Sequence, residues 1–185
     1  MKPGVRVTGG ELRGRGLAVP PGARPTEGRV REALFSIWAD RLPGARFLDL
    51  FAGSGVVGIE AAGRGALDVL AVDDDPRAAR TIAGNAARLM AGTVGAVAVL
   101  RLKLPAGLAR LTGRSFDLVF ADPPYAFDGH AALLAAVAPL LARDGEIVVE
   151  HSARLDLPLE AGPLVRTDVR RYGESGLSFY RMQSP

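Results

Sequence analysis

From residue 46 onward, short apolar segments alternate with segments of helical pattern. The predicted strands cover residues 46–51, 69–72, 96–100, 116–120 and 146–150. Helices are predicted at residues 56–63, 76–90 and 128–142, with helical material near residues 106–111. The strands are apolar along their whole length, which is typical of parallel strands covered by helices on both faces. The alternation therefore predicts an α/β fold with a doubly wound, mostly parallel sheet.

Both ends of the chain are predicted to form hairpins. Residues 165–171 and 177–182 flank a glycine-containing turn, so the last strand should insert antiparallel into a sheet of seven strands. Residues 5–8 and 15–19 flank Gly9-Gly10 and indicate a smaller hairpin. We therefore expect an N-terminal arm over residues 1–25, followed by one domain over residues 26–185.

The first helix of that domain is predicted to begin at Thr26, which follows Pro25 and is a suitable N-cap. Pro43-Gly44 should end the helical segment. Its predicted buried face consists of Val30, Leu34, Ile37, Trp38 and Leu42.

Composition excludes several kinds of site. The chain has no cysteine, which rules out disulfides, thiolate metal sites and cysteine nucleophiles. His130 and His151 lie far apart without metal-ligand spacing, so no metal is expected. No stretch reaches the roughly 18 uncharged apolar residues that a membrane span requires, and the N-terminus has no signal-peptide core. We expect a cytoplasmic protein that does not enter a membrane.

Positive charge is concentrated at the N-terminus. Residues 1–31 hold seven basic and two acidic residues, a net charge of +5, whereas the whole chain carries only +3. A basic arm on a mildly acidic body indicates a polyanionic partner that binds at one end. The alternative is a general preference of this chain for arginine.

The segment FLDLFAGSGVVGIEAA joins a predicted strand to a predicted helix and contains a G-x-G-x-x-G pattern at residues 53–58. This pattern is typical of dinucleotide-binding sites, and Asp73 ends the next strand 20 residues after Gly53. A pyrophosphate over this loop would face Asp49 at short range, which is unfavourable in a partly dry cleft. S-adenosylmethionine has no phosphate but carries an ammonium and a sulfonium that Asp49 can help to neutralise. The segment therefore predicts S-adenosylmethionine as the cofactor.

Asp73 is then expected to accept hydrogen bonds from the ribose hydroxyls. The alternative is that Asp73-Asp74-Asp75 only cap the helix that begins at Pro76. The predicted cofactor-binding residues are Asp49, Phe51, Ala52, Gly53, Ser54, Gly55, Asp73 and Asp74.

The segment VFADPPYAF ends an apolar strand with the DPPY loop, residues 122–125. An exocyclic amine on a nucleobase is a poor nucleophile because its lone pair is delocalised into the ring. Asp122 and a backbone carbonyl held by Pro123-Pro124 can accept its two hydrogens and expose that lone pair to the methyl group. Tyr125 can stack on the base. Phe127 is expected to pack under the following helix. These residues predict metal-free methyl transfer to a nucleobase amine.

Together, FLDLFAGSG and VFADPPY resemble class I methyltransferases that act on exocyclic amines. The flanking segments VTGGELRGRGLAVP, RPTEGRVREALFSIW and RRYGESGLSFY are similar to the RsmD family of bacterial 16S rRNA guanine-N2 methyltransferases. The resemblance spans nearly the whole chain. It implies a Rossmann-like fold and methylation of a guanine N2 amine in small-subunit rRNA, with residues 122–125 as the catalytic residues.

The resemblance also implies how the substrate is held. The arm and first helix would bind RNA through phosphate contacts from Arg13, Arg15, Arg24, Arg29 and Arg31, with the target guanine splayed into the DPPY pocket. Tyr172-Gly173 would brace the site. The expected partner is 16S rRNA in an assembling small ribosomal subunit, with ribosomal proteins as part of the docking surface and the enzyme acting as a monomer.

Two departures from the family pattern leave alternatives open. Residues 100–105, LRLKLP, lack the acidic residue that often meets the adenine amine, and Gly28 replaces a common acidic residue. A DNA adenine-N6 or cytosine-N4 methyltransferase would use the same DPPY chemistry, although no extra target-recognition domain is evident. A non-catalytic RNA-binding assembly factor with a vestigial cofactor pocket is another alternative. A nicotinamide oxidoreductase is opposed by Asp49.

Overall fold

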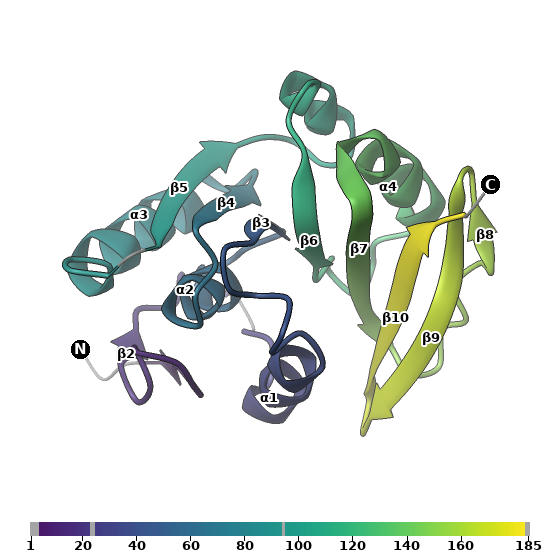
Figure 1. Ribbon diagram of the computed structural model, residues 1–185. Coiled ribbons are helices and arrows are strands. Elements are labelled where there is room, and N and C mark those ends of the chain that lie inside the picture. Colours follow the sequence, from purple (N-terminus) through teal and green to yellow (C-terminus); the bar gives the residue numbers. More distant parts are fainter. Residues whose placement is uncertain (1–3, 23–24, 94, 184–185) are drawn as a thin grey trace.

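The computed structural model describes residues 4–22, 25–93 and 95–183 (Figure 1). Within these residues the chain forms a two-stranded sheet and an eight-stranded sheet with the strand order β5-β4-β3-β6-β7-β10-β9-β8. The first five strands in that order are parallel, and β10 pairs antiparallel with β7 and β9. The predicted doubly wound α/β fold and the antiparallel insertion of the last strand are confirmed.

Most strands of the large sheet lie close to the predicted segments, but β7 begins at Leu141, inside the helix predicted for residues 128–142. The strands are β3 (Arg46–Leu50), β4 (Asp68–Asp73), β5 (Ala96–Arg101), β6 (Phe116–Ala121), β7 (Leu141–Ser152), β8 (Glu160–Ala161), β9 (Leu164–Tyr172) and β10 (Ser175–Met182). The sheet has one strand more than the seven predicted. The extra strand is β8, a two-residue edge strand too short to produce a recognisable pattern.

Helices cover both faces of the sheet (Figure 1). They are α1 (Gly28–Ile37), α2 (Val56–Gly63), α3 (Pro76–Leu89) and α4 (His130–Val137), with 3-10 turns η1 (Ala106–Leu111) and η2 (Ala138–Leu140). One apolar core joins α1, α2 and the end of α3 to one sheet face, and a second joins α4 and η1 to the other. No helix among the described residues is long and apolar enough to cross a bilayer.

The central strands owe their apolar sequence to burial on both faces. Residues 47–50 of β3 and 118–121 of β6 are buried without interruption, whereas the edge strand β5 alternates between exposed and half-buried residues. Removing apolar surface from water at about 25 cal/mol per Å² is the main stabilisation of such a layer. The parallel arrangement brings the carboxyl ends of β4, β3 and β6 together at one edge of the sheet.

The N-terminal arm packs against the large core. Its two short strands, β1 (Val5–Arg6) and β2 (Gly16–Leu17), pair antiparallel. Val7, Leu12 and Leu17 are buried in the core that contains α1 and α2. The side chain of buried Asn85 accepts a hydrogen bond from the Ala18 N–H and donates one to the Ala18 carbonyl, at 3.0 and 2.9 Å. The arm is thus attached to α3 as well.

Helix α1 differs from the prediction in three ways. It ends at Ile37 rather than at Pro43-Gly44, and turn residues 38–41 follow it. Its N-cap is Glu27, whose side chain makes no capping bond, rather than the predicted Thr26. The hydroxyl of Thr26 does not cap the helix because it donates to Asp122. Ile37 is 43% exposed, since the buried stripe runs through Val30, Leu34 and Trp38. The indole N–H of Trp38 donates to Glu146 on β7 at 2.6 Å and fixes the helix on the sheet.

Candidate active site

Three carboxylates meet where the parallel strands end. Asp49 lies within β3, Asp73 ends β4, and Asp122 follows β6. Asp73 and Asp122 line an open cleft of about 400 Å³, and Asp49 and Asp122 line a smaller cavity of about 30 Å³ beside the glycine loop, residues 51–55. Among the described residues, no group of three or more His, Cys, Asp or Glu side chains is placed so that it could hold a metal ion. The site therefore attracts cations through carboxylates and disfavours phosphate groups.

Three residues of the glycine loop have positive φ angles. Gly53 and Gly55 have φ angles of 56° and 75°, in the left-handed region that favours glycine. A Cβ on Gly55 would lie 2.9 Å from Ile82, whereas a Cβ on Gly53 would meet only the Phe51 carbonyl, at 3.9 Å. Gly55 thus permits close packing, and Gly53 leaves open space beside the loop. Phe51 itself has a φ of 58°, a strained conformation for a bulky residue.

Asp49 is 2% exposed and accepts the Gly58 N–H at 2.9 Å. Burial raises its pKa to about 7, the hydrogen bond from Gly58 partly opposes that rise, and the charges of Asp122 and Asp73 add to it. The pKa of Asp49 in the donor-free protein therefore lies near neutral pH. A cation placed in the adjoining cavity would favour its charged form.

The three consecutive aspartates have different surroundings. Asp73 accepts the Gly53 N–H at 2.8 Å and the Asp75 N–H at 3.0 Å, so it fixes the glycine loop while it lines the cleft. Asp74 is exposed and also lines the cleft. Asp75 accepts the Arg77 N–H at 2.8 Å and is the N-cap of α3. The capping alternative thus holds for Asp75, and Asp73 and Asp74 face the candidate cofactor site.

The glycine loop contains one polar side chain that the fold does not satisfy. The hydroxyl of Ser54 is buried, lines the smaller cavity, and has no hydrogen-bond partner among the described residues. A buried hydroxyl without a partner is costly, so a polar ligand group in this cavity would stabilise it. The space beside Gly53, the cluster of carboxylates and the Ser54 hydroxyl fit a cationic, phosphate-free cofactor.

The DPPY loop lies at the same edge. The Asp122 N–H donates to the Leu50 carbonyl at 3.3 Å, which ties the loop to β3. The hydroxyl of Thr26 donates to Asp122 Oδ2 at 3.0 Å, and Thr26 is 8% exposed. Pro123 is buried, whereas Tyr125 is 67% exposed and lines the cleft. The loop therefore presents an oriented carboxylate and an accessible aromatic ring to the same space.

Phe127 packs as expected. Its ring makes edge contacts with Phe51 at 5.3 Å and with His130 at 5.1 Å between centroids. It joins the core on the α4 side of the sheet. The contact couples the DPPY loop to the strained residue of the glycine loop.

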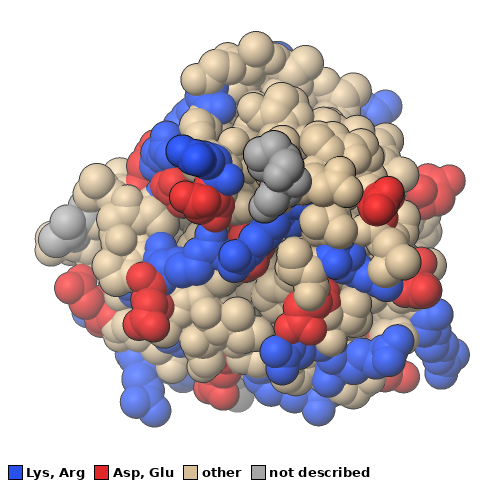
Figure 2. Space-filling model, turned by 45° about the vertical axis from the view of Figure 1, so that its right-hand side comes forward, with Lys and Arg blue, Asp and Glu red and all other residues tan. Residues whose placement is uncertain are grey.

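The predicted RNA-binding arginines have different environments. Arg13 and Arg15 are exposed on the arm and form no salt bridge within the described part of the chain. Arg29 is exposed and bonds to Glu27 at 2.9 Å, and its guanidinium lies against Gly173 in the C-terminal turn. Arg24 lies outside the described residues. Figure 2 shows that basic residues on the face it presents are interspersed with acidic ones.

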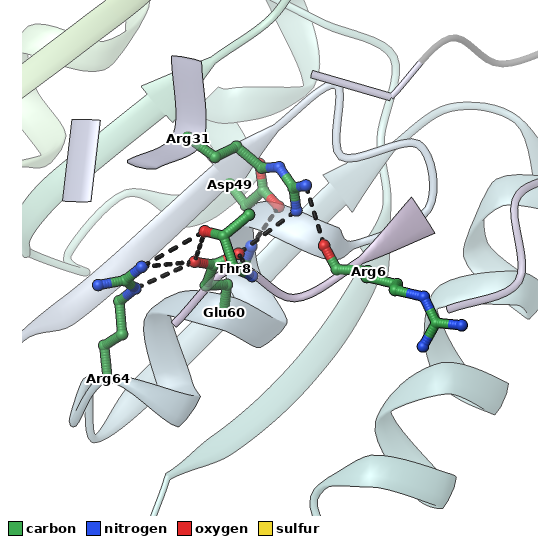
Figure 3. A network of polar contacts seen from close by, with 7 residues as sticks. Arg6, Thr8, Arg31, Asp49, Glu60 and Arg64 are labelled. Atoms are coloured by element: carbon green, nitrogen blue, oxygen red, sulfur yellow. Dashed lines mark hydrogen bonds and ion pairs between the residues drawn. The ribbon is translucent and has the colours of Figure 1, made fainter. Parts of the chain in front are cut away.

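The prediction for Arg31 is wrong. Arg31 is 2% exposed, and its guanidinium donates to Glu60 on α2 at 3.3 Å and to the Arg6 carbonyl at 3.0 Å. Glu60 also accepts hydrogen bonds from the N–H and hydroxyl of Thr8 and from Arg64 at 2.8 Å. Figure 3 shows these side chains converging on Glu60. Arg31 therefore joins the arm, α1 and α2 and cannot reach a phosphate at the surface.

The sequence did not predict the residues that line the cleft opposite the glycine loop. These residues come from β7 and the start of β10 and include Glu150, His151 and Ser175. The Nδ1 of His151 lies 2.9 Å from the Ser152 carbonyl and must donate to it, so Nε2 accepts from the Ser178 hydroxyl at 2.8 Å. Burial lowers the pKa of His151, which keeps the ring neutral. The available signal was the polar sequence EHS at the carboxyl end of an apolar strand.

Nearly the whole chain resembles known proteins. The family model described as Conserved hypothetical protein 95 matches residues 5–181. YlbH of Bacillus subtilis (strain 168) is 37% identical over 183 residues, which cover 96% of this chain and 98% of that protein. Ribosomal RNA small subunit methyltransferase D of Escherichia coli (strain K12) is 36% identical over 160 residues, which cover 85% and 77% of the two chains. The solved structure of a hypothetical protein of Thermus thermophilus aligns with a TM-score of 0.81 at 38% identity, covering 95% of this chain and 98% of that one.

Proposed function

The chain belongs to the RsmD family of methyltransferases, and we propose that it methylates the exocyclic N2 amine of a guanine in small-subunit (16S) ribosomal RNA, with S-adenosylmethionine as the donor. Its fold is that of the class I methyltransferases. The observation that carries the proposal is the shared cavity of Asp49, Ser54 and Asp122 beside the open cleft. It supports a cationic donor and a nucleobase amine meeting at one point.

When bound, S-adenosylmethionine supplies an electrophilic methyl group. Asp49 would attract its ammonium, and the Ser54 hydroxyl would bond to the polar part of its methionine moiety. Asp73 has acceptor lone pairs left beyond its two N–H contacts and would bond the ribose hydroxyls. Gly53 leaves room for close approach of the donor to the backbone. Phe51, Ala52, Gly55 and Asp74 complete the proposed cofactor site.

The DPPY loop would activate the amine. Asp122 accepts one amine hydrogen. The carbonyl of Pro124 already accepts the Phe127 N–H at 2.8 Å, so the carbonyl of Pro123 is the second acceptor in this scheme. The two bonds draw the nitrogen toward a tetrahedral geometry and aim its lone pair at the methyl group. Orientation of this kind contributes roughly 7–11 kcal/mol. The amine proton leaves to Asp122 or to solvent after transfer.

Tyr125 would hold the base. Its exposed ring at the cleft offers a stacking platform, and such stacking contributes about 1–3 kcal/mol per base. A guanine splayed from its helix would reach this ring without distortion of the sheet. The proposed phosphate contacts are Arg13, Arg15, Arg24 and Arg29. The proposed RNA-binding extension is the arm over residues 1–25. We further propose that the protein acts as a monomer on an assembling small subunit.

The proposal is tested by identifying the methylated nucleoside. The protein is incubated with labelled S-adenosylmethionine and, in separate reactions, naked rRNA, small subunits that lack the modification, and duplex DNA. Label in N2-methylguanosine from rRNA or subunits supports the proposal. Label in N6-methyladenine or N4-methylcytosine from DNA, or RNA binding without transfer, overturns it.

Affinity for the donor should depend on pH because of Asp49. Its pKa of about 7 means that below pH 7 a proton must leave before Asp49 can attract the ammonium, so affinity should fall about tenfold per pH unit. Calorimetric titration of the purified protein with S-adenosylmethionine between pH 5.5 and 7.5 measures this. Asp49→Asn should bind more weakly and remove most of the slope. An equally steep slope in that variant would assign the titration to another group.

The pH dependence of folding stability that Asp49 causes in the donor-free protein has the opposite sign to that of donor affinity: stability falls as pH rises, whereas affinity increases. Because the folded state raises this pKa, the contribution of Asp49 to the stability of the donor-free protein is fully present below the ordinary aspartate pKa and is lost as pH rises through about 7. Stabilisation by the donor should therefore be greatest above pH 7. Thermal melts with and without donor across the same pH range compare the two effects.

Replacing Arg13 and Arg15 together with alanine should weaken RNA binding and flatten its salt dependence. Each lost phosphate contact reduces the slope of log K against log[salt] by about 0.7–0.9. Filter binding or fluorescence anisotropy with rRNA at 50–300 mM salt gives the slope. Arg110 and Arg143, also exposed, provide the matched control pair far from the arm. An unchanged slope in the Arg13 and Arg15 variant would remove the arm from the interface, and an equal loss of slope in the control pair would show that the effect is not specific to the arm.

A further inference from the structure

A second carboxylate lines the same cleft as Asp122. Glu150 lies on β7, is 7% exposed, and contributes to the wall of the open cleft. The hydroxyl of Ser175, at the start of β10, donates to Glu150 Oε1 at 2.9 Å. The carboxylate is therefore held in a defined orientation by the C-terminal hairpin.

The sheet register places Glu150 beside Asp122. Strands β6 and β7 are parallel, and Ala121 is paired with Val149. Asp122 and Glu150 are the next residues after that pair. Neighbouring strands are about 4.8 Å apart, and paired side chains of parallel strands point to the same face. The two carboxylates thus follow a paired position on neighbouring strands and line the same cleft.

The nucleobases differ in the group that neighbours their exocyclic amine. In guanine the N2 amine lies beside N1–H, so two hydrogen-bond donors stand side by side. In adenine and cytosine the amine lies beside a ring nitrogen that only accepts. An ionised carboxylate also only accepts hydrogen bonds. A second carboxylate next to the amine acceptor is therefore complementary to guanine and repels the other two bases.

We propose that Glu150 accepts the N1–H of the target base and selects guanine, with Ser175 as the residue that positions it. This inference rests on the proposed function and names the residue that sets its base specificity. His151 lines the same wall, but both of its ring nitrogens are engaged within the protein. Because Glu150 is 7% exposed, a base that placed a ring-nitrogen lone pair against its carboxylate would meet electrostatic repulsion with little screening by water.

The probe is 2-aminopurine, which keeps the exocyclic 2-amine but has an unprotonated N1. RNA substrates are prepared with guanosine or 2-aminopurine riboside at the position that the transfer assay identifies. The wild-type protein should methylate the 2-aminopurine substrate at least about 100-fold less efficiently in kcat/KM. Comparable rates on the two substrates would overturn the role of Glu150 without any variant.

Glu150→Gln should reverse part of this preference. The amide can donate to an unprotonated N1, so activity on guanine should fall while the ratio between the two substrates narrows to less than about tenfold. Ser175→Ala should shift the ratio in the same direction by a smaller factor. Unchanged donor affinity and melting temperature show that the fold is intact. An unchanged ratio in Glu150→Gln refutes the inference, whereas absence of guanine methylation by the wild-type protein refutes the proposed function itself.

Discussion

Replacing Asp122 with alanine should reduce methyl transfer by about 10²–10³-fold while the protein still binds S-adenosylmethionine. The loss is that expected when one aligned hydrogen-bonding group is removed from a reacting centre. Donor binding should persist because Asp49, Ser54 and Asp73 remain. Single-turnover transfer of labelled methyl groups gives the rate, and calorimetric titration gives the donor affinity.

Two further variants sharpen this experiment. Asp122→Asn keeps one acceptor oxygen and should lose less activity than Asp122→Ala. Asp128→Ala is the matched control, since Asp128 is exposed, follows the same loop and does not line the cleft. Loss of donor binding in Asp122→Ala with an intact fold would contradict the assigned role, as would a rate similar to that of the wild-type protein.

Replacing Glu60 with alanine should lower the free energy of unfolding by about 3–5 kcal/mol. The change leaves the guanidinium of Arg31 buried without its counter-charge, and removing one partner of a buried ion pair has a cost of this size. Burial already lowers the pKa of Arg31, and its Nε has no hydrogen-bond partner among the described residues. Glu60 therefore supplies most of the compensation for the burial of the charged Arg31 guanidinium. Urea denaturation followed by circular dichroism measures the change.

An exposed ion pair supplies the comparison. Asp168→Ala removes the partner of Arg170 at the surface and should change stability far less than Glu60→Ala does. The double variant Arg31→Met with Glu60→Leu should recover part of the stability lost in Glu60→Ala, because no buried charge remains. A cost below about 1 kcal/mol for Glu60→Ala would show that water or another group compensates Arg31.

Local patterns in the sequence predicted most of the fold. The buried strands have apolar sequences whatever their neighbours. Helix α2 begins and ends at the predicted residues because Gly55 is its N-cap and Gly65 follows its C-cap, Arg64, both glycines with positive φ angles. The glycine loop and the DPPY loop were found for the same reason, since each is contiguous and follows a strand. Strand β8 was missed because two residues carry no periodicity.

Contacts between distant segments could not be predicted in this way. Thr26 has the sequence context of an N-cap, but its hydroxyl binds Asp122, 96 residues later. Arg31 occupies a position on α1 that looks exposed until Glu60 is placed opposite it. One signal was available: Glu60 stands in the apolar segment VVGIEAAG, and a carboxylate buried there requires a cation.

The attachment of the arm limits how the protein can be re-engineered. A replacement arm would have to supply apolar groups equivalent to Val7, Leu12 and Leu17, as well as a hydroxyl in place of Thr8. Without the apolar groups a cavity would remain beside α2, and without the hydroxyl the buried carboxylate of Glu60 would lose a hydrogen-bond donor. The proposed RNA contacts and the packing against α1 and α2 therefore belong to the same arm, and substitution of Arg13 and Arg15 is a milder change than exchange of the whole segment.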